Sequence, residues 1–311
     1  MIDMHGSRRR WLAATACSIG ALAAGSGRAV EPFKRSGVGR LRLSLAAYGF
    51  RQFFQWSRGK PQVPKDVVRS LSIGSFVDLA ADLGCEGAEL TSYYFEPDVN
   101  ATGLLDLRRR AFLRGITISG SAVGNTFTLP AGDERDAQIA SVKEWIDHTA
   151  LLGAPHLRVF AGAAVQGQSA DEARACCIAA LEECCDHAAA KGVMLGLENH
   201  GGIVATADDL LAIVRAVRSP WLGVNLDTGN FHSDDPYADL VRCVPYAVNV
   251  QYKVEIQRSA NGPKEPADAA RIVKLLTDGG YQGFVSLEYE ATEDPYEAVP
   301  RHLGELRAAI G

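Results

Sequence analysis

Four short apolar runs toward the C-terminal end of the chain each finish close to an oxygen-bearing side chain. In order, these side chains are Glu198 in GVMLGLENH, Asp227 in WLGVNLDTGN, Gln251 in YAVNVQYK and Glu288 in GFVSLEYE. The gaps of 29, 24 and 37 residues can each hold one loop, one helix and one strand. In a barrel of parallel strands, side chains at the carboxyl ends of the strands converge on one mouth. Four convergent oxygen donors, three of them carboxylates, predict a divalent-metal site and therefore an enzyme.

From residue 41 onward, the hydrophobic pattern alternates between strands and helices. The expected strands cover residues 41–47, 87–90, 116–123, 156–160, 193–198, 222–227, 247–254 and 284–290. A helical pattern follows or precedes each of them, and several strands read as continuous apolar runs, as expected when both faces are buried. We therefore predict a single (β/α)8 TIM barrel over residues 40–311. A doubly wound open sheet is the rival, but no GxGxxG follows the first strand.

The first 30 residues predict an export signal. An apolar stretch that runs to about Ala24 follows three arginines, Arg8, Arg9 and Arg10. The segment Gly27-Arg28-Ala29 then has small residues at the −3 and −1 positions of a cleavage site. This pattern is typical of a twin-arginine signal and predicts a periplasmic or exported protein. The alternative is a membrane anchor, but the stretch is shorter than the roughly 20 residues that a span requires. We therefore expect no stable membrane span after cleavage.

Composition narrows the class of protein. Charged residues make up 22% and apolar residues 47% of the chain, which is typical of a soluble globular protein. The net charge of −5 argues against a nucleic-acid surface, which is usually basic. No CxxC occurs, and Cys176, Cys177, Cys184 and Cys185 share one expected helix, so we predict buried free thiols.

A long aromatic loop, residues 48–70, follows the first expected strand. It contains Phe50, Phe53, Phe54 and Trp56. Their rings can stack on a sugar or an aglycone, or they can form a small satellite core or a dimer contact. The sequence leaves both interpretations open.

The combined pattern resembles the xylose-isomerase-like barrel superfamily of sugar-phosphate isomerases and epimerases. The matching segments are GLENHGG, NLDTGNF, VQYKVE and VSLEYE, with LGCEGAEL and LGAPHLRVFAG earlier in the chain. The resemblance implies metal ligation by Glu198, Asp227, Gln251 and Glu288. Gln251 stands where the superfamily usually has a histidine, and an all-oxygen ligand set favours Mg²⁺ or Mn²⁺ over Zn²⁺.

The same superfamily includes endonuclease IV, a DNA-repair enzyme with a three-zinc site. Of the seven histidines, only His200 and His232 are expected to reach the barrel mouth. Two histidines cannot build that site, so we expect no nucleic-acid substrate.

Proton transfer next to a metal-bound carbonyl is the chemistry that this site implies, with Glu198 and Glu288 as the catalytic groups. His200 can bind substrate hydroxyls or orient a ligand, and Asn230 is the preferred substrate contact in the turn after Asp227. Lys253 can neutralise an oxyanion or a phosphate, or pair with a ligand carboxylate. Glu89 can contact substrate or form an ion pair.

Three functions compete. The first is a metal-dependent sugar isomerase or epimerase that works through an enediolate. The second is a lyase or hydratase that cleaves 3-keto-glycosides by β-elimination at the same site. The third is a non-catalytic sugar-binding protein. Each implies a small-molecule carbohydrate partner, and an exported protein would meet unphosphorylated sugars; a homo-oligomer is possible.

Overall fold

The computed structural model describes residues 29–37 and 39–311. The predicted export signal, residues 1–30, lies outside the described residues apart from its last two positions. Within the described ranges, no helix has the length and apolar character needed to cross a bilayer.

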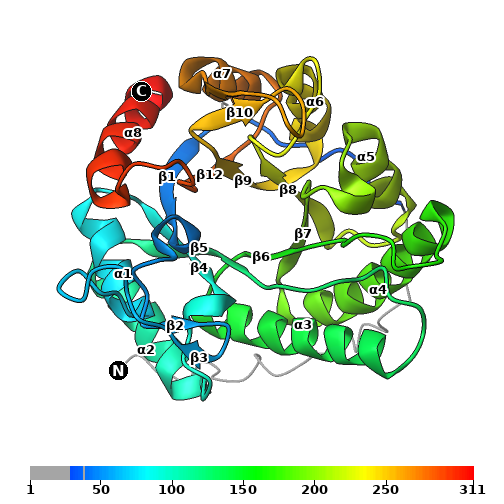
Figure 1. Ribbon diagram of the computed structural model, residues 1–311, viewed down its shortest axis with the longest axis horizontal. Coiled ribbons are helices and arrows are strands. Elements are labelled where there is room, and N and C mark those ends of the chain that lie inside the picture. Colours follow the sequence, from blue (N-terminus) through cyan, green and yellow to red (C-terminus); the bar gives the residue numbers. More distant parts are fainter. Residues whose placement is uncertain (1–28, 38) are drawn as a thin grey trace, which may run out of the picture.

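The described residues form a closed barrel of eight parallel strands surrounded by eight α-helices (Figure 1). The strands, in chain order, are β1 Leu41–Ala46, β4 Gly87–Thr91, β5 Thr117–Ala122, β6 His156–Val159, β7 Met194–Glu198, β8 Leu222–Asp227, β9 Ala247–Tyr252 and β12 Gly283–Leu287. The first and last strands pair in parallel, with Leu41 opposite Gly283, and this pairing closes the ring. The predicted TIM barrel is confirmed.

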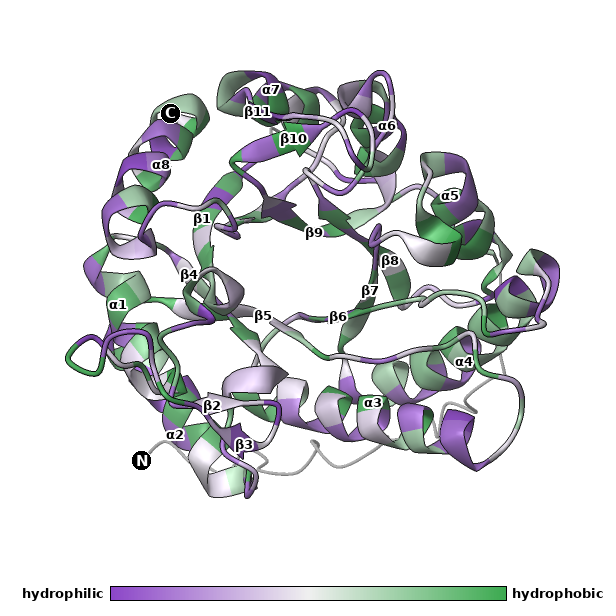
Figure 2. Cartoon of the chain, in the orientation of Figure 1, coloured by the Kyte–Doolittle hydropathy of each residue, from purple (hydrophilic) through white to green (hydrophobic). Residues whose placement is uncertain are grey.

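The helices that cover the strands are α1 Ile73–Asp82, α2 Ala101–Leu113, α3 Asp133–Leu152, α4 Ala170–Lys191, α5 Ala207–Ala216, α6 Pro236–Cys243, α7 Ala269–Asp278 and α8 Pro295–Ile310. They carry both hydrophobic and hydrophilic residues (Figure 2), as expected for helices that pack on a barrel and face water.

Local capping explains where several of these helices begin and end. Ser169 and Glu172 form a capping box at the start of α4, and the Thr206 hydroxyl accepts a hydrogen bond from the Asp209 amide at the start of α5. Gly153 and Gly192 end α3 and α4 in left-handed conformations with φ of 71°.

Two small antiparallel ribbons lie outside the barrel sheet. The first pairs β2 Trp56–Ser57 with β3 Lys60–Pro61, and the second pairs β10 Glu255–Gln257 with β11 Lys264–Pro266. Four single-turn 3₁₀ helices in the described chain complete the connections: η1 Ala47–Phe50, η2 Ser92–Tyr94, η3 Gly202–Val204 and η4 Val244–Tyr246. The β10–β11 ribbon follows the end of β9 and therefore stands beside the barrel mouth.

The aromatic loop after β1 folds into a satellite core. Phe50, Phe53 and Phe54 are each no more than 1% exposed. The Phe53 ring meets Tyr296 of α8 edge-on at 4.9 Å, and the Phe54 ring stacks on Tyr94 at 4.2 Å. Of the two interpretations left open above, burial favours the satellite core for these three rings.

The chain enters the barrel from its N-terminal face. The Phe33 amide donates a hydrogen bond to the Pro245 carbonyl, and the Arg35 guanidinium donates one to the Ala247 carbonyl at the start of β9. Val30 is 5% exposed and belongs to the hydrophobic core. The folded unit therefore begins before residue 40, the boundary that the sequence suggested.

All six cysteines of the described residues are free thiols, namely Cys85, Cys176, Cys177, Cys184, Cys185 and Cys243. Five are buried, and Cys176 is partly buried. The prediction of buried, unpaired thiols on α4 is confirmed for three of its four cysteines and holds in part for Cys176.

Candidate functional site

The four predicted oxygen donors lie at the carboxyl ends of four adjacent strands. Glu198 ends β7 and Asp227 ends β8, while Gln251 is the penultimate residue of β9 and Glu288 directly follows β12. All four side chains belong to residues that are at most 5% exposed. Parallel strand order brings them to one barrel mouth, as the sequence predicts.

Local hydrogen bonds hold these strand ends in register. The Asn199 side chain accepts a hydrogen bond from the Asp227 amide and donates one to the Asp227 carbonyl, both at 2.9 Å. The Lys253 amide donates to the Thr228 hydroxyl, and the Glu288 amide donates to the Tyr252 carbonyl. These bonds tie neighbouring strand ends to one another at the mouth.

Glu198 is held by a cation and two hydrogen-bond donors. Its Oε2 lies 2.9 Å from the Arg158 Nε of β6. Its Oε1 lies 2.8 Å from the His200 Nδ1 and 3.2 Å from the Asn230 Nδ2. Burial opposes ionisation of Glu198, but Arg158 and His200 outweigh burial and lower the pKa of this carboxyl.

The environment of His200 and Arg158 is partly aromatic. The His200 ring lies 4.4 Å from the Phe160 ring, and the Arg158 guanidinium lies over the same ring at 3.9 Å. The His200 side chain is 57% exposed, so it is the member of this group that faces the open mouth. His200 and Asn230, both predicted substrate contacts, therefore meet at Glu198.

Lys253 lies among three carboxylates. Its Nζ is 2.5 Å from Glu288 Oε2 and 3.3 Å from Asp227 Oδ2, and it also contacts Glu290 Oε2. The Lys253 side chain is 10% exposed. Burial disfavours its ammonium form, but these carboxylates outweigh burial and raise the pKa of Lys253 well above its ordinary value. Of the roles that the sequence left open for Lys253, the geometry matches pairing with the predicted ligand carboxylates.

Gln251 belongs to a buried amide network below the mouth. Its Oε1 accepts a hydrogen bond from Asn225 Nδ2 at 2.6 Å, and its Nε2 donates to Glu89 Oε1 at 2.6 Å. The second oxygen of Glu89 accepts from Asn249 Nδ2 at 2.7 Å. Burial raises the pKa of Glu89 to about 7. Glu89 is 1% exposed and accepts the hydrogen bond that orients the Gln251 amide, and its contact with substrate stays a prediction.

The donor set does not fit a divalent cation as it is arranged. Among the described residues, no group of three or more His, Cys, Asp or Glu side chains is placed to hold a metal ion. Lys253 stands between two of the predicted carboxylate ligands, Asp227 and Glu288. The amide oxygen of Gln251, the predicted neutral ligand, already accepts a hydrogen bond from Asn225. The expected Mg²⁺ or Mn²⁺ ligation is therefore not supported by this geometry.

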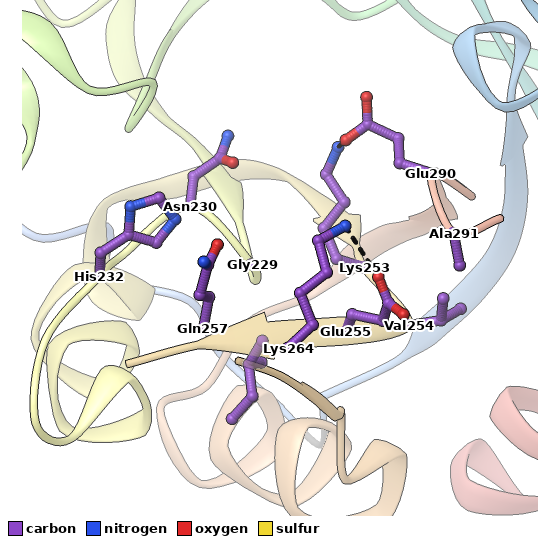
Figure 3. A pocket seen from close by; sticks show the side chains of 11 residues that line it. Gly229, Asn230, His232, Lys253, Val254, Glu255, Gln257, Lys264, Glu290 and Ala291 are labelled. Carbon is purple, nitrogen blue, oxygen red and sulfur yellow. Dashed lines mark hydrogen bonds and ion pairs between the residues drawn. The ribbon is translucent and has the colours of Figure 1, made fainter. Parts of the chain in front are cut away.

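A pocket of about 110 Å³ opens beside Lys253, between the turn after β8 and the β10–β11 ribbon. Figure 3 shows Lys253 reaching toward Glu290, with Asn230 and His232 at the other side of the pocket. Lys264 of the ribbon pairs with Glu255 at 2.9 Å across its floor. Polar and charged side chains make up most of its lining, and Val254, Ile256 and Ala291 supply an apolar part, so it can take a hydroxyl-rich group.

Glu290, Asn225 and Asn249 belong to the site without being among the residues that the sequence pattern indicates. Strand side chains alternate, so Glu290 shares a side with Glu288 just as Lys253 shares one with Gln251. That rule could have found Glu290. The same alternation places Asn225 on the side of Asp227 and Asn249 on the side of Gln251, but one step deeper in the barrel. Their contacts with Gln251 and Glu89 are what only the structure shows.

Comparison with known proteins agrees with this architecture. A family model described as xylose isomerase-like TIM barrel matches residues 77–306. No curated protein matches the chain at the sequence level.

Several solved structures share the fold. D-Psicose 3-epimerase, solved in the presence of D-fructose, has a TM-score of 0.66 and 16% identity, covering 86% of this chain and 96% of that one. The 3-keto-D-glucoside 4-epimerase from E. coli has a TM-score of 0.62 and 16% identity, covering 87% and 99%. A probable 3-DHS dehydratase from Bacillus anthracis has a TM-score of 0.63 and 17% identity, covering 86% and 98%. These likenesses establish the fold, and the family match spans most of the barrel, so the chain belongs to the xylose isomerase-like TIM barrel family.

Proposed function

We propose that this protein is an enzyme that epimerises or isomerises a small carbohydrate by moving a proton next to a carbonyl group. One observation carries the proposal: two carboxylates, Glu198 and Glu288, lie at one barrel mouth, each beside a fixed cation. A positioned carboxylate can take a proton from carbon, and a fixed positive charge stabilises the oxyanion that forms. The names of similar structures, two of them sugar epimerases, support this class of reaction.

The reaction can be written on this chain's own residues. One carboxylate accepts the proton of the C–H bond next to the carbonyl, the bonding pair forms the C=C of an enediolate, and the carbonyl pair moves to oxygen. The second carboxylate, in its protonated form, returns a proton. Return to the opposite face of the same carbon gives the epimer. Return to the neighbouring carbon, together with transfer of the hydroxyl proton on the first carbon to the former carbonyl oxygen, gives aldose–ketose isomerisation.

Hydrogen exchange with solvent tests this proposal. Purified protein is incubated with a panel of ketoses and keto-sugars in D₂O, and NMR follows deuterium entry next to the carbonyl. We expect exchange with at least one sugar, and a loss of about 100-fold or more in Glu198→Gln and in Glu288→Gln, the size of effect that a general acid–base group contributes. Absence of both exchange and interconversion across the panel would contradict the proposal.

The pocket beside Lys253 favours a second candidate, a lyase or hydratase acting on 3-keto-glycosides. A sugar at the mouth would leave this pocket free for a group attached to it. The same proton abstraction then expels a leaving group placed β to the carbonyl. Release of an aglycone from a 3-keto-glucoside, with none from the parent glucoside, would select this reaction over epimerisation.

A non-catalytic sugar-binding protein is the remaining alternative. It predicts saturable binding of a sugar that is unchanged in Glu198→Gln and Glu288→Gln, without exchange in any of the three proteins. Calorimetric titration of the same panel distinguishes it from both enzymes.

We also propose that the protein is exported by the twin-arginine route. The paired arginines and the following apolar stretch motivate this proposal. Fractionation with N-terminal sequencing tests it, and light scattering of the purified product measures whether a homo-oligomer forms. A full-length protein recovered only from the cytoplasm would contradict export.

A further inference from the structure

The ammonium group of Lys253 occupies the centre of the carboxylate cluster at the mouth. Asp227 comes from β8, Lys253 follows β9, and Glu288 and Glu290 follow β12. The three carboxylates approach Lys253 Nζ from the two strands on either side of β9. A point charge surrounded by oxygens from neighbouring strands is the arrangement in which a metal ion would otherwise be held.

Each predicted metal ligand has a protein nitrogen atom at ion-pair or hydrogen-bond distance, and among the described residues the buried Asp227 Oδ2 has the nitrogen of Lys253 at 3.3 Å without accepting a hydrogen bond. Glu198 pairs with Arg158, and Asp227 and Glu288 face Lys253. Gln251 accepts from Asn225. Reversing the Gln251 amide would set its oxygen against the Glu89 carboxylate, which now accepts at 2.6 Å, so the network fixes the amide in its present orientation.

We infer that the Lys253 ammonium takes the role of the divalent cation at this site, so that the reaction needs no metal. The inference rests on the proposed function for its chemistry. Two of the three Lys253 N–H groups donate to Glu288 and Glu290, so the third donates to the carbonyl oxygen of the substrate as that oxygen gains charge, and Lys253 keeps its own proton throughout. The proton removed from carbon passes to a carboxylate, so charge and atoms balance without a further reactant.

Metal titration tests the inference independently of any substrate. Wild-type protein is stripped with chelator and titrated with Mn²⁺ and Mg²⁺ by calorimetry, and the metal content of the untreated protein is measured by elemental analysis. We expect no saturable binding and well under one metal per chain. Stoichiometric binding of either ion by the wild-type protein would overturn the inference, whether or not a sugar substrate has been found.

The Lys253→Met variant sharpens the test. Removal of the ammonium leaves three carboxylates facing one another, so this variant is expected to gain a binding site for Mn²⁺ and a Tm that rises with Mn²⁺ concentration. Lys264→Met is the matched control, because Lys264 pairs with a single carboxylate on the exposed ribbon. It is expected to gain no site. Equal Mn²⁺ responses in the two variants would count against the role given to Lys253.

The rate of hydrogen exchange provides a second test of the inference. If exchange is found, we expect its rate in wild-type protein to change less than twofold in EDTA, and Lys253→Met to lose at least 100-fold. A rate that falls in EDTA and returns with Mn²⁺ would overturn the inference while leaving the proposed function intact. A lack of exchange in every protein would remove the proposed function while the titration still reports on the metal. Should Lys253→Met fail to fold, the wild-type titration decides alone.

Discussion

At the scale of single residues, the Arg158–Glu198 pair is the most enclosed ion pair at the mouth. Only 4% of each side chain is exposed. Two charges withdrawn from water stabilise each other, but either one alone is costly. Their pairing fixes the position of the carboxylate to which His200 and Asn230 also bind.

Arg158→Met tests this dependence. We expect the free energy of unfolding to fall by about 3–5 kcal/mol, because Glu198 is left buried without its cation. Lys274→Met removes one member of an exposed pair with Asp278, whose side chains are 74% and 61% exposed, and should cost less than about 1 kcal/mol. Denaturant unfolding measures both, and similar small losses would show that Glu198 does not depend on Arg158.

The buried His156 is expected to make the free energy of unfolding depend on pH. This fully buried side chain lies at the N-terminal end of β6, far from the mouth along its strand, and desolvation lowers its pKa to about 4. The unfolded chain, with an ordinary histidine pKa near 6.5, then binds the proton more tightly than the folded one. The stabilisation is present above about pH 6.5 and is lost as pH falls toward about 4, by up to about 3 kcal/mol.

The measurement is the free energy of unfolding between pH 7 and pH 4 for wild-type protein and His156→Leu. The variant should lose stability less steeply over that window, because its side chain takes up no proton. Equal slopes would contradict the assignment.

At the scale of the elements, the barrel strands are packed so closely that single glycines matter. Gly120 of β5 has no side chain, and a Cβ placed there would lie 2.0 Å from the His156 ring of β6. His156 therefore fills the space in front of Gly120, and the two residues form one packing unit across adjacent strands.

Gly120→Ala is expected to destabilise the protein by about 1–3 kcal/mol or more, since neither the ring nor the strand can move freely. Gly304→Ala is a matched control within α8, where an added Cβ meets nothing within 4 Å. That change should stabilise by about 0.5–1 kcal/mol, because alanine suits a helix interior better than glycine. Thermal unfolding compares them, and changes of the same sign would contradict this account.

The aromatic loop shows what sequence could not decide at this scale. From sequence alone, its phenylalanines fit a sugar-stacking loop as well as they fit a small core. The partners are Tyr296 of α8, near the end of the chain, and Tyr94 of η2. No local pattern indicates that these distant rings meet.

At the scale of the whole molecule, residues 30–37 belong to the folded unit. They run across the N-terminal face of the barrel, where Arg35 also lies over the Tyr281 ring at 5.3 Å. Removal of residues 29–37 is expected to lower Tm by about 3–6 °C, which corresponds to roughly 1–2 kcal/mol for a domain of this size. Scanning calorimetry measures the shift, and an unchanged Tm would place the boundary at residue 40 after all.

The sequence by itself determined the order of strands and helices, the closed barrel and the gathering of Glu198, Asp227, Gln251 and Glu288 at one mouth. These follow from hydrophobic period and chain direction, which are local properties. Only the tertiary structure decided what those side chains touch. Whether Asp227 and Glu288 face a metal ion or Lys253 depends on cross-strand register and on the direction of each side chain. The Asn225–Gln251–Glu89 network joins partners that are 26 and 162 residues apart. The spacing of residues along the chain does not predict such contacts, because they form only when the strands pack side by side.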